Sequence, residues 1–376
     1  MGLKNPKPGT KFPGFLKNYR MRLTYCIAIT LIFSTACTQK HQIGSDFGDP
    51  IPLTSILQNP SIFASYPEAF FSLDSFLVVI SPRIGDDFGR LISQKTFQEV
   101  GTFGNRGKGP KETIWPYMLP HDLDKKKRSF LGYDLPSRSI ITYTLQQQGD
   151  TLTMQTHDKR RVDSQNENPN EPNLKICRLD SNYYMGNCFH KQDQFFSLLD
   201  KNLNTIGYFG NSPIPEDIFN AHERLQGLLQ SSYGIAIFTP LELPYIGCYT
   251  IQEGKPAKLW EDNFADMNYH VTGKTLLYNS KKTRGVTRDL QITPRYIYIL
   301  WYDDLVYNYY NSDQGSSPGG RVVFVYDHQG NRITRYALDV DVTKIAVSED
   351  ERTLYGLTTP DYALVTFELP ETYPQN

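Results

Sequence analysis

Short runs in which apolar and polar residues alternate recur along most of the chain, and polar turns separate them. In residues 363–369, one set of alternate positions is wholly apolar, whereas the other includes Thr366 and Glu368. A period of two residues is that of a β-strand with one face buried. The pattern therefore predicts a chain of short antiparallel strands joined by tight turns.

Two of these strand–turn–strand segments repeat one another closely. Residues 94–105 read QKTFQEVGTFGN and residues 200–211 read DKNLNTIGYFGN, so that five of twelve positions are identical. Fainter copies occur in residues 134–145, 239–251 and 322–338. A repeat of this kind indicates that one structural unit recurs along the chain.

The spacing of the copies is that of a propeller blade. Ile140 lies 40 residues after Val100, Ile246 lies 40 residues after Ile206, and Ile333 takes the same position in the last copy. Repeats of about 40–50 residues made only of short strands are typical of a β-propeller, in which each blade is a four-stranded sheet. The longer intervals contain two polar segments, residues 155–173 and 303–320, which we interpret as inserted loops.

The strands after the last copy predict how the ring closes. Residues 345–369 provide about three strands, one fewer than a blade needs. The segment IPLTSIL at residues 51–57 could pair beside them and complete that blade. We therefore predict an all-β fold, a six-bladed β-propeller of four-stranded antiparallel blades closed by N- and C-terminal strands. Alternation alone would also suit a β-sandwich.

The N-terminal region predicts export. The first 36 residues contain six Lys or Arg residues and no Asp or Glu. The apolar run Leu23–Phe33 is shorter than the ~20 residues that a membrane-spanning helix needs, and it fits the core of a signal peptide. Translation could begin at Met1 or at Met21, and both starts predict export.

The residues after this run resemble the lipobox of bacterial lipoproteins. They are Ser34, Thr35, Ala36 and Cys37, small residues that end in a cysteine. The resemblance implies that Cys37 accepts a diacylglycerol and becomes the new N-terminus, although Ser34 stands where Leu is usual. An ordinary signal peptide that is cut near Ala36 is the alternative.

These features predict four segments. Residues 1–36 form a signal peptide, 37–50 a lipidated tether, 51–370 a single β-propeller domain and 371–376 a C-terminal tail. The protein is then anchored to the membrane by its N-terminal lipid, in the cell envelope. The sequence TQKHQIGSD after Cys37 leaves periplasmic and surface orientations open.

Composition narrows the classes of partner. Six of the 39 Lys and Arg residues lie in the signal segment, which leaves 33 against 40 Asp and Glu, so a nucleic-acid partner is not expected. The 25 Tyr and 21 Phe residues argue against disorder, and a mean hydropathy of −0.46 argues against repeated membrane crossing. We expect a soluble body that is a monomer.

Neither the cysteines nor the histidines are spaced as metal ligands. Cys177, Cys188 and Cys248 include no CxxC pair, and the seven histidines form no HxH or HExxH motif. We predict buried free thiols, because the simplest hairpin places Cys177 opposite Met185. A bridge between Cys177 and Cys188 is the alternative. We predict no metal site and no cofactor.

Several segments carry a resemblance to a known family. They are FGNRGKGPKE at residues 103–112, AHERLQGLLQSSYG at 221–234, VFVYDHQGNRITRYALD at 323–339 and IAVSEDERTLYGLTT at 345–359. Over nearly all of its mature length, the chain resembles the TolB-like six-bladed β-propeller lipoproteins of the Bacteroides group. Lys111 and Glu351 stand where that family more often has Gly. The resemblance implies the fold and the location but no particular activity.

The segment GNRGKGPKE holds candidate binding residues. It is not a phosphate-binding P-loop, because Pro110 follows Gly109 where such a loop requires Lys and Ser or Thr. We interpret the segment as a tight crossing between blades, with Glu112 bonding to loop amides. Arg106 and Lys108 are then solvent-facing cations that could meet an anionic group.

Residues 104–112 and 210–217 are equivalent linkers in the repeat alignment, so their tips should lie on one side of the ring, near the mouth of the channel. The candidate ligand-binding residues are Arg106, Lys108, Glu216 and Asp217. The leading hypothesis is a membrane-tethered binding or scaffold lipoprotein that recognises a protein, peptide or glycan partner on this face, with Arg106 and Lys108 binding an anionic or polar ligand.

The alternative is a propeller enzyme that acts on glycans or lactones in its central channel. The aromatic run at residues 300–310 would suit a sugar, because sugar rings stack on aromatic faces. The letters GSSPG at residues 315–319 match GxSxG, but they lie in the segment that we interpret as an inserted loop. A nucleophile elbow requires a strand-to-helix turn, so the sequence offers no catalytic elbow, which favours binding over catalysis.

Overall fold

The computed structural model describes residues 45–59, 66–81, 87–124, 128–148, 151–157, 159–162, 175–187, 193–312 and 318–371. The predicted signal peptide, the predicted lipidation residue Cys37 and the segment around Cys188 lie outside the described residues. The predictions for these three therefore stay predictions.

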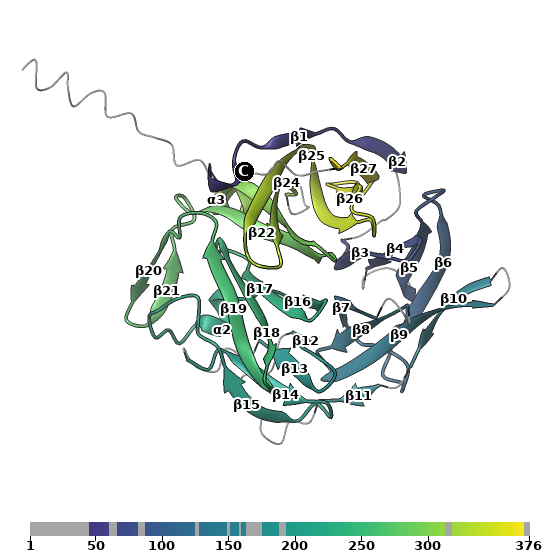
Figure 1. Ribbon diagram of the computed structural model, residues 1–376, viewed down its shortest axis with the longest axis horizontal. Coiled ribbons are helices and arrows are strands. Elements are labelled where there is room, and N and C mark those ends of the chain that lie inside the picture. Colours follow the sequence, from purple (N-terminus) through teal and green to yellow (C-terminus); the bar gives the residue numbers. More distant parts are fainter. Residues whose placement is uncertain are drawn as a thin grey trace, which may run out of the picture. The chain divides into compact units, whose positions relative to one another are not determined.

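The first four blades are antiparallel sheets of four strands each, with one further short strand in blade 2 (Figure 1). Blade 1 contains β3 (Ala69–Leu73), β4 (Phe76–Ile80), β5 (Asp87–Ser93) and β6 (Glu99–Asn105). Blade 2 contains β7 (Pro116–Asp124), β8 (Ser129–Asp134), β9 (Ser139–Gln148), β10 (Thr151–Thr156) and the short β11 (Arg160–Arg161). Blade 3 contains β12 (Ile176–Arg178), β13 (Tyr183–Gly186), β14 (Phe196–Asp200) and β15 (Thr205–Phe209). Blade 4 contains β16 (Gly227–Ser232), β17 (Ile235–Pro240), β18 (Tyr245–Gln252) and β19 (Lys255–Asn263).

Blades 5 and 6 share one long strand, β25 (Arg332–Val347). Its first half pairs with β24 as the outer strand of blade 5, and its second half pairs with β26 as the inner strand of blade 6. The other strands of blade 5 are β22 (Arg284–Ile292), β23 (Tyr296–Leu305) and β24 (Gly320–Asp327). The other strands of blade 6 are β26 (Thr353–Thr358), β27 (Leu364–Glu368) and β2 (Ile56–Asn59).

The inner strands form a closed circuit, which fixes the number of blades. Following the chain, β3 contacts β7, β7 contacts β12, β12 contacts β16, β16 contacts β22, β22 contacts β25, and β25 returns to β3. Six inner strands in a ring make six blades. The predicted all-β, six-bladed propeller is confirmed.

The N-terminal strands close the ring in two steps. β2 pairs antiparallel with β27, with Ile56 opposite Thr366, so it supplies the missing outer strand of blade 6 as predicted. β1 (Ile51–Leu53) instead runs parallel to β25 beside blade 5. Between them, the amide of Ser55 donates to Asp339 over 3.0 Å. The segment 51–57 therefore fastens two neighbouring blades together.

The strong repeats are in structural register, and the two faint copies with a 40-residue spacing are not. β6, β15 and the first half of β25 are the outer strands of blades 1, 3 and 5. Ile140 and Ile246 lie in β9 and β18, which are the third strands of blades 2 and 4. Third and outer strands both alternate after a polar turn. The spacing alone therefore assigned Ile140 and Ile246 to outer strands, although they lie in third strands.

Aromatic side chains fill the spaces between blades. Phe71 of blade 1 lies 5.0 Å from Phe130 of blade 2, and Phe196 of blade 3 lies 5.0 Å from Tyr249 of blade 4, measured between ring centroids. Cys177 and Cys248 are buried, and Cys177 lies opposite Met185, as predicted. Packing between blades accounts for much of the aromatic content.

Glu351 occupies a turn in which the resembled family more often has Gly. Its φ of 57° lies in the left-handed region that favours glycine. The side chain is buried, and its carboxylate accepts a hydrogen bond from Arg295 Nε over 2.5 Å. The ion pair with Arg295 offsets part of the backbone strain, which explains how this turn tolerates a residue other than glycine.

Candidate functional site

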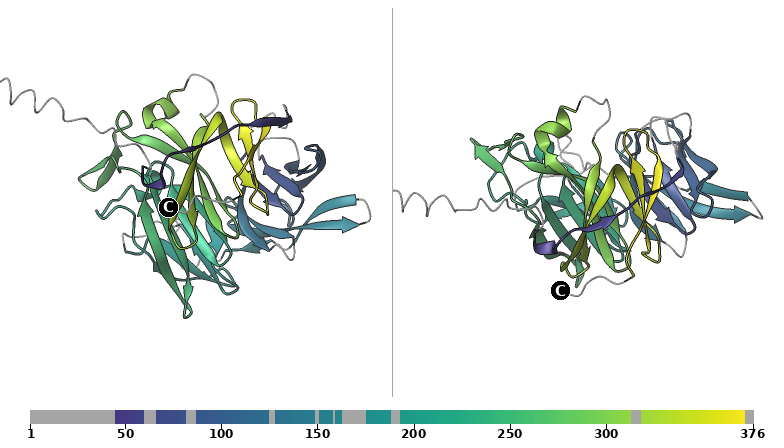
Figure 2. Two further views of the ribbon diagram at one scale, coloured as in Figure 1. Left: turned by 45° about the horizontal axis from the view of Figure 1, so that its top comes forward. Right: turned by 90° about the horizontal axis from the view of Figure 1, so that it is seen from above.

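One face of the propeller carries the linkers between blades. Because strands alternate in direction within a blade, each linker from an outer strand to the next inner strand crosses the same face, together with the loops between second and third strands. Linkers 104–112 and 210–217 lie there, as do the hairpin β20 (Tyr269–Thr272) and β21 (Thr275–Tyr278) and the helix α3 (Val306–Tyr310). Figure 2 shows the hairpin and α3 on the same side, and we call this side the linker face.

Linker 104–112 braces itself. Gly104 has a φ of +82°, and a Cβ built on it would lie 2.3 Å from the Phe88 ring, so only glycine fits. The Glu112 carboxylate accepts a hydrogen bond from the Gly109 amide over 2.8 Å, as the sequence predicted. Arg106 and Lys108 are exposed on this braced backbone.

The end of this linker is fixed to blade 2 by Asp134. Its buried carboxylate accepts hydrogen bonds from the amides of Trp115 over 2.9 Å and Ile114 over 3.2 Å. Lys159 Nζ lies 3.2 Å from the same carboxylate. Sequence reasoning missed Asp134, because its carboxylate bonds amides 19 and 20 residues earlier in the chain, and local turn signals concern only an Asp that bonds its own neighbouring backbone.

Linker 210–217 begins with a glycine of positive φ, like linker 104–112, but its stabilising contacts come from a neighbouring hairpin. Gly210 has a φ of +74°, and a Cβ there would lie 2.9 Å from the Phe196 ring. Beyond it, Asp217 forms an ion pair of 2.6 Å with Lys274, and Glu216 accepts a hydrogen bond of 3.2 Å from the Tyr269 hydroxyl. Both acidic tips therefore contact the hairpin β20–β21.

A cleft of about 430 Å³ opens beside linker 210–217, between blades 3 and 4. Its wall includes Asn211 and Ser212 of the linker, Tyr245 of β18, and Lys258 and Glu261 of β19. The Tyr245 hydroxyl donates to Glu261 over 2.8 Å, and Lys258 Nζ lies 2.7 Å from the same carboxylate.

The electrostatics of the cleft follow from these contacts. Burial raises the pKa of Tyr245 far above its usual value, so its hydroxyl remains a hydrogen-bond donor. Burial opposes ionisation of Glu261, but the hydrogen bonds from Lys258 and Tyr245 outweigh it and hold its pKa below the usual value. The cleft thus presents a carboxylate, an ammonium group, a hydroxyl and an amide, which suits a polar ligand. Sequence reasoning missed the pair of Tyr245 and Glu261. These two residues are diagonal neighbours on β18 and β19, and only the register of the two strands brings them together.

The aromatic run 300–310 divides between the core and the linker face. Trp301 is fully buried, whereas Tyr307 and Tyr310 of α3 are exposed. The Tyr310 hydroxyl donates to Glu242, which holds one ring in place. Phe219, at the end of the neighbouring linker region, is 71% exposed. The linker face therefore carries exposed aromatic side chains as well as both signs of charge.

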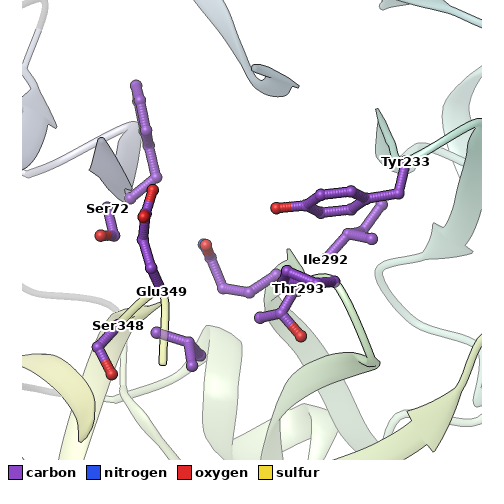
Figure 3. Close-up of a pocket in the computed structure, with 10 residues that line it drawn as sticks. Ser72, Tyr233, Ile292, Thr293, Ser348 and Glu349 are labelled. Atoms are coloured by element: carbon purple, nitrogen blue, oxygen red, sulfur yellow. The ribbon is translucent and has the colours of Figure 1, made fainter. Parts of the chain in front are cut away.

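The opposite mouth of the channel holds a small pocket (Figure 3). It is lined by turns that follow inner strands, including Ser72, Tyr233, Thr293 and Glu349, and its volume is about 20 Å³. Tyr233 and Glu349 project toward the same space. The volume is enough for a water molecule and too small for an organic ligand.

The described ranges contain neither a grouped set of metal ligands nor a helix suited to span a membrane. No three His, Cys, Asp or Glu side chains in the part of the chain that the structure describes are grouped so that they could hold a metal ion. No helix within those same ranges is long and apolar enough to cross a membrane.

A family model described as TolB-like 6-blade propeller-like matches residues 261–350. The matched residues run from the end of blade 4 through blade 5 into blade 6, and they agree with the six-bladed fold and the TolB-like resemblance. The lipoprotein character and the Bacteroides group stay predictions. The search of curated proteins found no match.

Three solved structures illustrate the similarity to known folds. A DUF4221 family member from Bacteroides vulgatus is 9% identical, with a TM-score of 0.48 over 85% of this chain and 96% of that one. The β-propeller domain of Cps50 (Swd1) from Myceliophteria thermophila is 7% identical, with a TM-score of 0.45 over 84% and 100%. Hsv2 from Kluyveromyces lactis is 12% identical, with a TM-score of 0.37 over 84% and 74%.

Proposed function

We propose that the chain is a binding protein of the cell envelope that recognises a protein, peptide or glycan partner through its linker face. The observation that carries the proposal is the cleft of about 430 Å³ beside linker 210–217. Exposed aromatic rings and charged linker tips lie on the same face. Concave surfaces with aromatic and convergent polar groups are typical of ligand sites.

Within this proposal, the four charged tips select the partner. The backbones of both linkers are braced, by Glu112 in one and by the hairpin β20–β21 in the other. The tips themselves can therefore vary at little cost in stability. Arg106 and Lys108 would bind an anionic or polar group, and Glu216 and Asp217 would present the opposite charge.

A site-specific photo-cross-linker tests the face. Placed at Arg106 or at Glu216, it should capture the same partner in intact cells. The matched control is Glu253, which is exposed in the turn between β18 and β19, on the side away from the linkers. A partner captured only from position 253 would place the binding site on the face opposite the linkers and would contradict the proposal.

The membrane tether is a separate part of the proposal. We infer from the apolar run Leu23–Phe33 and the segment Ser34–Cys37 that Cys37 carries a lipid. Mass spectrometry of the membrane fraction should find an acylated N-terminal peptide that begins at Cys37, and Cys37→Ala should abolish it. An unmodified soluble mature protein in the wild type would refute the tether.

A further inference from the structure

Three cationic residues lie on or directly beside the inner strands of three blades, which form the closed circuit around the channel. Lys175 directly precedes β12, Arg288 lies on β22 and Lys344 lies on β25. Arg288 and Lys344 are each only 6% exposed, and Lys175 is half-buried. Lys344 interacts electrostatically with Lys175 and with Arg288.

Lys344 has its own counter-charge. Its Nζ lies 3.5 Å from the carboxylate of Asp289, which also accepts a hydrogen bond from the Ile345 amide over 2.9 Å. Burial opposes the charge of Lys344, but Asp289 outweighs it and holds the lysine pKa above its usual value. Burial raises the pKa of Asp289, and Lys344 opposes that rise, so each of the two buried groups depends on the other to keep its charge.

Arg288 has no such partner. Its guanidinium donates to the hydroxyls of Tyr309 and, at 3.4 Å, of Tyr66, and it lies 5.0 Å from the centroid of the Tyr309 ring. Its Nε is buried without a hydrogen-bond partner. No carboxylate among the described residues lies within ion-pair distance of it. A buried arginine whose described hydrogen-bond partners are neutral hydroxyls is still not compensated in charge, so binding an anion would stabilise it.

Lys175, like Arg288, lacks a carboxylate partner among the described residues. Its side chain forms no ion pair within the described ranges, and burial together with Lys344 lowers its pKa to about 8. Its amide donates over 2.5 Å to Asn187 Oδ1, while Asn187 Nδ2 is buried with no partner. Lys175 and Asn187 thus add two donors for which the described chain provides no acceptor.

Among the described residues, the charge balance of the cluster is positive. Beside the pair of Asp289 and Lys344, the charges that the described ranges contribute are Lys175, Arg288 and one carboxylate, Glu68, which acts on both lysines. Glu68, Tyr66 and Lys175 are partly exposed, so solvent reaches this level of the channel. Electrostatic attraction is stronger in such a partly desolvated site than in bulk water.

We propose that this part of the channel binds an oxyanion, a carboxylate or phosphate group, with Arg288 and Lys175 as its direct partners. The planar guanidinium of Arg288 matches an oxyanion in geometry, and Lys175 adds a second charge. The site is distinct from the cleft and the linker tips, and it does not depend on the identity of the partner bound there.

Isothermal titration calorimetry of the full chain tests the proposal, with inorganic phosphate and succinate as separate probes. At least one probe should bind, and Arg288→Gln and Lys175→Gln should each weaken that binding about tenfold or more. Arg284→Gln is the matched control, because Arg284 is an exposed arginine on the same strand, and it should leave the affinity within about twofold. Binding of phosphate alone, or of succinate alone, identifies the oxyanion.

Two outcomes would overturn the proposal. Either neither probe binds at millimolar concentration, so that water alone fills the site, or binding survives in both variants. Should Arg288→Gln fail to fold, Lys175→Gln carries the test. In that variant the melting temperature without anion should rise, because a half-buried charge that forms no ion pair within the described ranges is removed, and the stabilisation that phosphate gives the wild type should be lost.

Discussion

Positive charge occurs in two settings in this propeller, and they differ in what holds it. Arg106 and Lys108 are exposed on a linker whose backbone is fixed by Glu112. Arg288 and Lys344 are almost fully buried in the channel, where Asp289 compensates only one of them. Solvated charges can change at little energetic cost, whereas buried charges tie the stability of the fold to their partners. The comparison separates a variable surface from a constrained interior.

The largest effect should come from breaking the buried pair. Asp289→Ala leaves Lys344 buried without its counter-charge, and we expect a loss of about 3–5 kcal/mol in the free energy of unfolding. Urea denaturation measures it. The double variant Asp289→Ala with Lys344→Met should recover most of the loss. A single variant within about 1 kcal/mol of the wild type would mean that the pair is not constrained as described.

The next effect should come from breaking the backbone of the exposed linker. Gly104→Ala combines a left-handed φ of +82° with a Cβ 2.3 Å from the Phe88 ring, so we expect a loss of about 2–4 kcal/mol. Gly254→Ala is the control, since its φ is +75° but its Cβ would meet nothing within 4 Å. Equal losses in the two variants would show that the contact with Phe88 is unimportant.

A smaller effect should appear as a pH dependence of the channel. The folded pKa of Lys175 is about 8, below its ordinary value, so between these values the unfolded chain binds more protons than the folded one. Stability contributed at this site should therefore rise as the pH rises through about 8, because the neutral amine no longer carries the cost of burying its charge or the repulsion from Lys344. The difference in unfolding free energy between Lys175→Gln and the wild type should narrow over this range, and a constant difference would contradict the assignment.

The smallest effect should come from the linker tips. Replacing both Arg106 and Lys108 by Ala should leave the melting temperature within about 1–2 °C, because exposed charges contribute little to stability. Calorimetry measures the temperature, and cross-linking from Glu216 reports loss of partner capture. A decrease of several degrees would instead make these residues structural.

The fold was predictable because its signals are local. The segments that end in FGN at residues 105 and 211 contain the turn and the outer strand of a blade within twelve residues. The alternation in residues 363–369 likewise predicted the strand β27, and the count of strands in its blade predicted that a further strand pairs with it. The two copies around Ile140 and Ile246 failed because third and outer strands have the same local pattern.

The channel site was not predictable, because its residues meet only in the folded ring. Lys175 and Lys344 come from different blades, and no spacing in the sequence relates them. The register of β22 against β23 shifts between Thr287 and Asp289, so Arg288 is the extra residue of a bulge. A period of two cannot anticipate that two successive residues, Arg288 and Asp289, both act on Lys344.

The divided closure by β1 and β2 also determines how the ring carries mechanical load. The 3-10 helix η1 (Ser45–Phe47) inserts Phe47 5.0 Å from the rings of Phe324 and Tyr326, and Asp46 pairs with Arg332 over 2.5 Å. A pull on the N-terminal end must first extract Phe47 and then separate β1 from β25 before any force reaches β2. Blade 5 therefore bears the tension, and the strand that completes blade 6 stays paired while it does.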